Sequence, residues 1–516
     1  MAKNIILCAD GTGNRGGYTP DSNVYKIYNA IEIHDNDHPQ ITFYDNGVGT
    51  SKNTYWRALS GAFGFGFKAN VCDLYEFLAR NYEPGDNVFI FGFSRGAATV
   101  RAFSGFIAAS GLVDGTDLNE DELQDRIKKA FKTYKVAERA PLLGEHGVIP
   151  VKFIGVWDTV SALGFPQDWN LPGIGMLLLN WFFKILEYLS NFVFPHRFYN
   201  YELTDNVAFA YQALAIDDER KTFKPMVWHE TGNTTVEQVW FAGAHSNVGG
   251  GYGRVGVANV ALDWMMTHAH HHGLEFKEDA AEKIRRNANV HGRLYNSRDG
   301  IAIYYRYHPR EIQKFCRSRL RGNVKIHDSV FERMRRKTGN YAPGHLPDTF
   351  DMVSTPANGA QPPETVEGDE TWQAWRRKVN RWVFLRKWLY AIFLEFTLLV
   401  VFSAGWFWIN PPSPGGDRAS ADNAWSLDWW VGHIADILNY ISPVYFEGLV
   451  TVAVIQHPNI FGWAVLFLIV LWALRKVFRH NNVRACEGAR NAMLTTLPAS
   501  PPKDSPDETQ PEGTNE

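Results

Sequence analysis

The sequence predicts an α/β fold with a mostly parallel β-sheet and helices on both faces. Up to about residue 253, short apolar runs bounded by turn residues alternate with segments whose apolar residues recur every three or four positions, the pattern of successive strand–helix units. The chain has 516 residues, of which 45% are hydrophobic, so it can bury a large core. This composition excludes an intrinsically disordered chain.

Five apolar runs are predicted to be strands, and two segments between them are predicted to be helices. The helical segments, residues 67–82 and 97–110, show the three-and-four spacing of apolar residues. The predicted strands are residues 4–9, 41–44, 87–93, 151–157 and 236–242.

Charge and cysteine content exclude several classes of protein. The formal net charge is −3 at pH 7, whereas a nucleic-acid-binding domain is usually strongly basic, so no nucleic-acid partner is expected. The apolar run at residues 5–9 is too short for a secretory signal. The cysteines are too scattered for a metal-binding pair and too few for a disulfide framework, so thiols in a reducing compartment are expected at Cys8, Cys72, Cys316 and Cys486.

Two segments of the first domain, predicted to cover residues 1–354, have more than one interpretation. Residues 164–199 form an insertion with an apolar helix-like stretch at 171–183, which is too short to span a bilayer. It is either a core helix or a lid or membrane-docking helix. Residues 283–337 are rich in Arg, Lys and Tyr, which is typical of a solvated helical face; contact with anionic lipid headgroups is the alternative.

The C-terminal third predicts a linker and a membrane region. Residues 355–371 are rich in Pro, Gly and Glu, as linkers are. In the membrane region 372–484, residues 388–409 and 455–474 can each cover the ~30 Å hydrocarbon core and are predicted transmembrane helices. Glu395 is expected to face the partner helix or an oligomer interface. Residues 485–516 form a C-terminal segment, predicted to be disordered from residue 498.

Charged residues around the predicted hairpin indicate its orientation. Basic residues precede the first apolar segment and follow the second, whereas the connection at 410–447 carries mainly acidic residues. By the positive-inside rule both ends of the hairpin, and with them the first domain, face the cytoplasm.

Residues 92–96 read Gly-Phe-Ser-Arg-Gly and match the pattern G-x-S-x-G between a predicted strand and a predicted helix. In that context the small residues allow a strained turn that exposes the serine, and the helix N-terminus favours a developing oxyanion. Ser94 is therefore predicted to be a catalytic nucleophile. The alternative is a tight turn whose serine only caps the helix.

A serine nucleophile needs a base and an acid that orients the base. Asp158 and His245 follow Ser94 in the order expected for this fold, each at the predicted end of a strand, and the glycines after His245 allow its loop to approach the serine. Asp158 has the alternative role of a helix N-cap. Asp217 and Asp218 are competing acids.

Backbone N–H groups are expected to stabilise the oxyanion. One comes from Arg95, after the nucleophile, and one from Gly11 or Thr12 in the loop after the first strand. This loop lacks the G-x-x-x-x-G-K-[ST] phosphate-binding pattern, and no cofactor is expected. A histidine group ends a predicted helix, where it suits the helix dipole, so no metal site is expected at His268, His270, His271 and His272.

Six ordered segments carry a family resemblance. They are residues 8–14 (Cys-Ala-Asp-Gly-Thr-Gly-Asn), 44–50, 92–97, 155–160 (Gly-Val-Trp-Asp-Thr-Val), 213–220 and the loop at His245, within the first 350 residues or so. The chain thus resembles the α/β hydrolases grouped as domain of unknown function 2235, which include the type VI secretion phospholipase effectors of the first lipase class. The resemblance implies an α/β-hydrolase fold, a triad of Ser94, Asp158 and His245, and ester hydrolysis of phospholipids. Asn247 stands where the family pattern has Asp, so the loop lacks that charge.

These observations predict a membrane-bound serine ester hydrolase, a phospholipase A-type enzyme, with a phospholipid or other acyl ester as substrate and the lipid bilayer as partner. Alternatives are a thioesterase or acyltransferase on the same triad, or a non-enzymatic membrane scaffold. The charge pattern favours a resident of a bacterial inner membrane over an exported effector acting at a target-cell membrane. An immunity or secretion partner is left open by the sequence.

Overall fold

The computed structural model describes residues 2–11, 13–14, 16–35, 37–47, 66–136, 144–161, 201–356, 362–409 and 458–497. Several predicted features lie outside these ranges. They are Thr12, the insertion at 164–199, the connection at 410–447, the tail from residue 498, and the first residues of the apolar segment 455–474.

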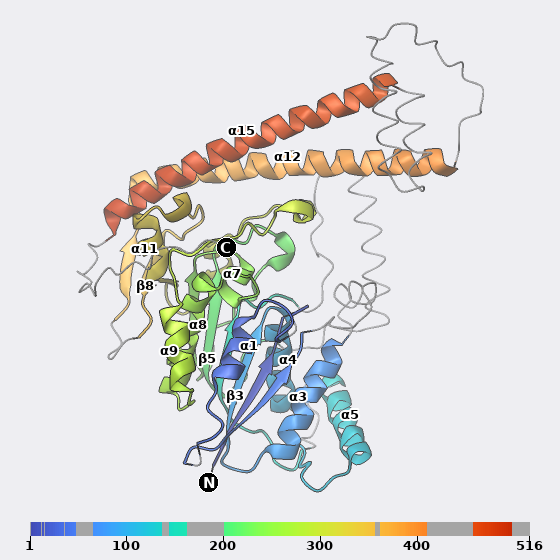
Figure 1. Cartoon of the computed structure of the whole chain (residues 1–516), viewed down its shortest axis with the longest axis vertical. Helices are drawn as coiled ribbons and strands as arrows, with labels where there is room; N and C mark the ends of the chain where they lie inside the picture. The colour runs from blue at the N-terminus through green and yellow to red at the C-terminus, as the bar shows by residue number, and fades with distance from the viewer. Residues whose placement is uncertain are drawn as a thin grey trace, which may run out of the picture.

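A nine-stranded sheet forms the centre of the chain, in the order β2-β1-β3-β4-β5-β6-β7-β8-β9 (Figure 1). The pairings from β2 through β8 are parallel, and β9 joins the edge antiparallel to β8. The predicted mostly parallel α/β fold is therefore confirmed. The strands are β1 Asn4–Ala9, β2 Gln40–Asp45, β3 Asn87–Phe93, β4 Val151–Trp157, β5 Val207–Ala215, β6 Thr235–Phe241, β7 Val324–His327, β8 Thr349–Val353 and β9 Glu364–Glu367.

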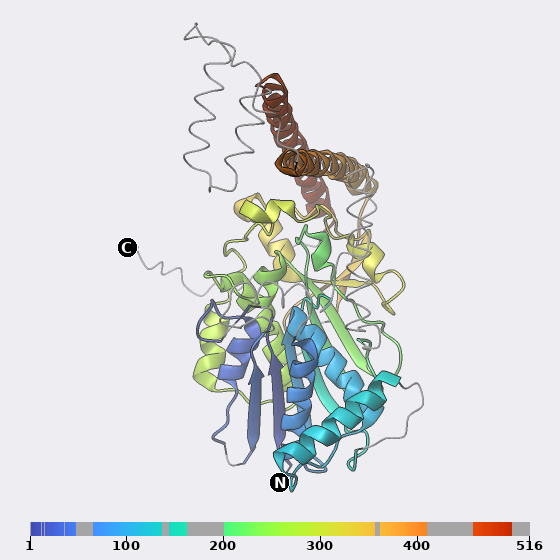
Figure 2. The same cartoon turned by 90° about the vertical axis from the view of Figure 1, so that its right-hand side faces the viewer.

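Helices connect the strands and cover both faces of the sheet (Figures 1 and 2). The predicted helices 67–82 and 97–110 correspond to α3 and α4. The helices are α1 Asn23–Ala30, α3 Phe67–Asn81, α4 Arg95–Ser110, α5 Glu120–Val136, α7 His245–Gly249, α8 Gly256–His271, α9 Glu278–Arg286, α10 Ile312–Cys316, α11 Asp328–Arg335, α12 Glu370–Ile409 and α15 Pro458–Thr496, with 3₁₀ turns at Lys221–Phe223, Gly300–Tyr304 and Thr338–Asn340.

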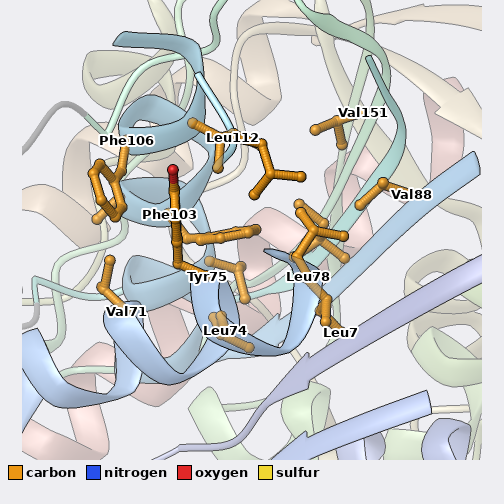
Figure 3. Close-up of a cluster of buried hydrophobic side chains, with 14 of the residues drawn as sticks. Leu7, Val71, Leu74, Tyr75, Leu78, Val88, Phe103, Phe106, Leu112 and Val151 are labelled. Carbon is orange, nitrogen blue, oxygen red and sulfur yellow. The ribbon is translucent and has the colours of Figure 1, made fainter. Parts of the chain in front are cut away.

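Alternate residues of the central strands enter two different cores, which is why these strands are apolar throughout. In β1, Leu7 packs with α3, α4 and α5 on one face, where Phe103 and Phe106 are fully buried (Figure 3). Its neighbour Cys8 points to the other face and packs with α1 and α8. The buried layers hold the strands in register, so the carboxyl ends of β1, β3, β4, β5 and β6 meet at one edge.

The long helices α12 and α15 lie side by side beyond the carboxyl ends of the strands (Figures 1 and 2). The first turns of α12 and the last turns of α15 pack on β6, β7, β8 and α11, and Val379, Val383, Ala489 and Met493 are buried there. The predicted boundary at residue 484 therefore falls inside α15, because the apolar face of this helix continues to its end. In the described ranges, no helix is long and apolar enough to cross a membrane, and the two predicted spans are not confirmed.

The predicted linker at 355–371 needs a correction. Its residues 364–367 form β9, which pairs with β8 and buries Val366. Proline and glutamate, which suggested a linker, are also the residues that protect the exposed edge of a sheet. The sheet therefore ends at residue 367, directly before α12.

Candidate active site

Ser94 lies in the sharp turn between β3 and α4. Its φ of 58° is in the left-handed region, which is unfavourable for a residue with a side chain and is typical of functional turns. A Cβ on Gly92 would lie 2.7 Å from Ala97 Cα, and a Cβ on Gly96 would collide with the carbonyl oxygen of Ala9. The G-x-S-x-G pattern thus has a direct steric cause.

A chain of hydrogen bonds joins Ser94, His245 and Asp158. The distance from Ser94 Oγ to His245 Nε2 is 2.7 Å, and that from His245 Nδ1 to Asp158 Oδ2 is 2.6 Å. Because an ionised carboxylate only accepts hydrogen bonds, Nδ1 carries the proton and Nε2 accepts from the Ser94 hydroxyl. All three side chains are buried. This arrangement can activate a serine hydroxyl for nucleophilic attack.

Asp158 is held by a guanidinium group that the sequence analysis did not single out. Arg310 donates from Nη1 to Asp158 Oδ1 (2.6 Å) and from Nη2 to Oδ2 (2.8 Å), and also to the carbonyl oxygens of Ala215 and Phe223. Burial alone would raise the pKa of the Asp158 carboxyl, but Arg310 and the hydrogen bond from His245 hold this pKa well below its ordinary value. Asp158 therefore stays ionised.

Arg310 belongs to the basic run 283–337, which was predicted to be a solvated face. In the structure its side chain is buried, since the loop before α10 turns it inward. No local motif marks this arginine among the other basic residues. Its role becomes visible only when β4 and this loop are brought together.

The competing acids lie next to the histidine loop but contact its backbone. Asp217 accepts from the N–H of Gly243 (2.7 Å) and from the hydroxyl of Tyr341 (2.8 Å). Asp218 pairs with Arg220 and accepts from the N–H of His245 (3.3 Å). In the described contacts, the carboxylate bonded to the imidazole ring is that of Asp158.

The loop after β1 lies directly beside the nucleophile. A Cβ on Gly11 would lie 3.2 Å from Ser94 Cβ. However, the N–H of Gly11 donates to the Asp10 carboxylate at 2.6 Å, so this group is already engaged. Thr12 lies outside the described residues, and Arg95 is the first residue of α4, where helix N–H groups point out of the helix.

Asp10, which the sequence analysis noted only within the loop, organises this side of the site. Besides the N–H of Gly11, its buried carboxylate accepts from Asn14 Nδ2 (3.0 Å), Ser22 Oγ (2.5 Å) and Tyr44 OH (2.6 Å). These bonds tie the loop to α1 and β2. Burial raises the pKa of Asp10, an effect that the hydrogen bonds oppose.

Aromatic rings surround His245. Phe93 lies 4.7 Å and Phe223 5.1 Å from the imidazole, measured between ring centres, and Tyr305 lies 5.8 Å from Phe223. Arg220 covers Phe223, with its Cζ 3.4 Å from the ring centre. These rings form an apolar wall beside the imidazole, as is common in ligand-binding pockets.

Two of the histidines at the end of α8 stack on aromatic rings, whereas His270 and His271 are exposed. His268 stacks on Tyr211 at 4.3 Å, and His272 stacks on Phe209 at 3.7 Å. Burial lowers the pKa of His268 to about 3. Within the described residues, no group of three or more His, Cys, Asp or Glu side chains is arranged to hold a metal ion.

Comparison with known proteins places the chain in a family. Residues 3–268, just over half of the chain, match the family described as the catalytic domain of Tle1-like phospholipase effectors of the type VI secretion system. The chain belongs to this Tle1-like family. The matched segment includes Ser94, Asp158 and His245 and ends before Arg310, α12 and α15.

Individual proteins are similar to parts of the chain. The uncharacterized protein YEL023C of Saccharomyces cerevisiae is 28% identical over 200 residues, which cover 33% of this chain and 28% of the yeast protein. The chain thus spans little more than a quarter of that relative. Among solved structures, the Tle1 effector bound to the VgrG spike of the type 6 secretion system is 15% identical with a TM-score of 0.34, covering 59% of this chain and 78% of that chain. An uncharacterized protein from Pseudomonas aeruginosa is 16% identical with a TM-score of 0.32, covering 76% and 59%.

Proposed function

We propose that the chain is a membrane-associated serine ester hydrolase that removes acyl chains from phospholipids, a phospholipase A-type enzyme. The main support is the hydrogen-bonded series Ser94, His245 and Asp158 in a domain of the Tle1-like phospholipase effector family. A serine, an imidazole and a carboxylate in this order are what acyl transfer to a serine requires.

The proposed reaction begins when His245 Nε2 takes the hydroxyl proton of Ser94 and Oγ attacks the acyl carbonyl carbon. Asp158, kept ionised by Arg310, stabilises the imidazolium that forms. The N–H of Arg95 and one from the loop after β1 are the proposed oxyanion donors. The imidazolium then protonates the departing lysolipid alkoxide, and a water molecule, activated in the same way, hydrolyses the acyl-enzyme.

Membrane association is supported by the surface of the two long helices. Leu399 on α12 is 62% exposed, and Trp463 and Ile469 on α15 are 71% and 55% exposed. Apolar surface of this extent favours a lipid environment. We also propose residence at a bacterial inner membrane with the catalytic domain in the cytoplasm, the alternative being export to a target-cell membrane. Protease accessibility of the catalytic domain in inverted and right-side-out membrane vesicles distinguishes these two topologies.

A fluorophosphonate probe tests the proposed nucleophile, because it reacts covalently with activated serines. Wild-type protein is expected to be labelled, Ser94→Ala unlabelled, and Ser104→Ala labelled like the wild type. Ser104 is a suitable control because it lies on α4, the helix that follows Ser94, and is also buried, and its hydroxyl has no partner in the described structure. Absence of labelling in folded wild-type protein would contradict the proposal and favour a non-enzymatic scaffold.

A further inference from the structure

A pocket lies where α12 and α15 leave the catalytic domain. Its floor is the segment around residues 298–307, and its walls are the two helices. It leaves about 110 Å³ for the centres of water-sized groups, several times the roughly 10–15 Å³ that one water molecule needs. The pocket therefore has room for a polar headgroup.

Arginines from three separate elements face this pocket. Arg298 is buried and donates from Nε and Nη2 to the carbonyl oxygens of Tyr305 and Ile303. Arg386 of α12 is 3.7 Å from the Glu219 carboxylate, and Arg475 of α15 lies exposed at the rim.

The charge balance of the pocket is positive. Among the described residues that line the pocket, three are arginines and none is a carboxylate. Glu219, which pairs with Arg386, lies outside the lining. Such a site attracts an anion.

A buried hydroxyl in the same pocket lacks a hydrogen-bond partner. Tyr307 is 2% exposed, lines the pocket, and its hydroxyl has no partner in the described part of the chain. The guanidinium groups of Arg298 and Arg386 lie over its ring at 5.0 and 4.1 Å. A buried donor without an acceptor is unfavourable, and a bound anion would supply the acceptor.

The rest of the pocket is apolar and open along the helices. Leu389 and Phe393 of α12 and Leu468 and Leu471 of α15 line it. Trp472 also lines it and is 57% exposed. A free inorganic anion would make no favourable contact with these apolar walls. A soluble amphiphile would need an enclosed channel to keep its chain out of water. The chains of a lipid in a bilayer, in contrast, can lie along the two exposed helices.

We propose that this pocket binds the phosphate group of an anionic phospholipid in a bilayer, distinct from the substrate lipid at Ser94. The Tyr307 hydroxyl donates to the phosphate, Arg298, Arg386 and Arg475 balance its charge, and the acyl chains follow the apolar side chains of α12 and α15.

The segment that forms the floor of the pocket also contacts the active site. The segment that forms the floor continues to Arg310, which holds Asp158. It also pairs with the strip that contains Phe223, through the hydrogen bonds from Lys221 N–H to Arg306 O (3.0 Å) and from His308 N–H to Glu219 O (2.8 Å). The distinction between this lipid and a substrate rests on the proposed hydrolase function, but the binding itself does not.

Binding of the full chain to vesicles tests the proposal in a Ser94→Ala background, where hydrolysis does not interfere. Phosphatidylcholine vesicles with and without phosphatidylglycerol are compared. Tyr307→Phe and Arg475→Gln are each expected to weaken binding to the phosphatidylglycerol vesicles roughly tenfold, the scale of one charge-assisted hydrogen bond, and to leave binding to pure phosphatidylcholine unchanged. Arg484→Gln is the matched control, because it removes the same charge at an exposed position of α15 outside the pocket.

Three results would overturn the assignment. An equal loss of vesicle binding in Arg484→Gln would mean that the basic residues of α15 are attracted to the charged bilayer surface without a specific site. Release from the vesicles by inorganic phosphate at constant ionic strength would mean a site for a free anion, and release by oleate below its micelle concentration would mean a fatty-acid site. If thermal melting shows that Tyr307→Phe does not fold, the binding of Arg475→Gln tests the proposal, because Arg475 is exposed and its substitution should not affect folding. Failure of hydrolysis in the Ser94-containing protein would leave this test unaffected.

Discussion

The candidate active site at the carboxyl ends of the strands and the outer parts of α12 and α15 differ in which residues they bury and which they expose. At the strand ends, Ser94, His245 and Asp158 are buried and joined to one another by hydrogen bonds. On the two helices, Trp463 and Leu399 are largely exposed. In the first region the functional groups are paired with one another, whereas the described outer turns of the two helices expose apolar surface, which favours contact with a lipid surface. Chemistry and membrane binding should therefore be separable by mutation.

The largest expected effect is that of His245→Ala. Loss of the general base should lower turnover of a soluble ester by at least about 10³-fold, while vesicle binding stays at the wild-type level. His271→Ala is the control, since His271 is an exposed residue at the end of α8. Steady-state hydrolysis and vesicle sedimentation measure the two properties. A parallel loss of both in folded protein would show that the two regions are not independent.

Arg310→Met should have the next largest effect, because it leaves the Asp158 carboxylate buried without its cation. We expect a loss of about 3–5 kcal/mol in the free energy of unfolding, measured by urea denaturation. Arg310→Lys, which keeps the charge but not the two-pronged contact, should fall between this variant and the wild type.

The pH dependence of the free energy of unfolding is a control for the interpretation of Arg310→Met. In the wild type the folded-state pKa of Asp158 is depressed, so its stabilisation is present above the unfolded pKa of about 3.9 and is lost as pH falls through the folded pKa. Without Arg310, burial should raise that pKa, and stability should instead decline as pH rises above about 4. A variant as stable as the wild type at every pH would contradict this role of Arg310.

Asp217→Asn tests whether Asp158 or Asp217 is the acid of the triad. Hydrolysis should change by less than about threefold, because Asp217 contacts the backbone of the His245 loop and not the imidazole. A drop on the scale of His245→Ala would make Asp217 the acid.

The free energy of unfolding of Asp217→Asn should also differ from that of the wild type in its dependence on pH. Burial raises the pKa of Asp217 to about 6, so the folded state binds more protons than the unfolded state between about pH 4 and 6, and stability falls as pH rises through that window. Asp217→Asn should lack this decline, which urea denaturation at several pH values measures.

Ile469→Ser should have the smallest effect on the catalytic domain. Ile469 is 55% exposed on α15, so the free energy of unfolding should change by no more than about 0.5 kcal/mol and hydrolysis of a soluble ester should not change. Binding to phosphatidylcholine vesicles should weaken. Unchanged binding would mean that this face of α15 does not contact the bilayer.

Local patterns predicted the central part of the fold, because the strands there are buried on both faces. β1, β2, β3, β4 and β6 all lie where continuous apolar runs predicted strands. β5 was not predicted as a strand, since its residues 207–215 include Gln212, whose buried side chain is paired with Thr159 and Gln238. The sequence of the edge strand β9 predicted a linker, because this segment becomes a strand only through its pairing with β8.

The candidate site could be predicted as far as its residues follow strand ends. Ser94, Asp158 and His245 stand in such positions in the sequence itself. Arg310 could not be found, because its partner is 152 residues away and its neighbours are equally basic. Nor does the sequence show that the N–H of Gly11 is engaged by Asp10, since that depends on the conformation of one loop.

The central claim is that Ser94 cleaves phospholipid acyl esters. The most direct measurement is acyl-chain release from mixed phospholipid vesicles by the purified wild type and by Ser94→Ala, with fatty acid and lysolipid both quantified. The account predicts release of both products in equal amounts by the wild type and a loss of about 10³-fold or more in Ser94→Ala. Equal release by the two proteins, or none by a folded, fluorophosphonate-reactive wild type, would contradict it.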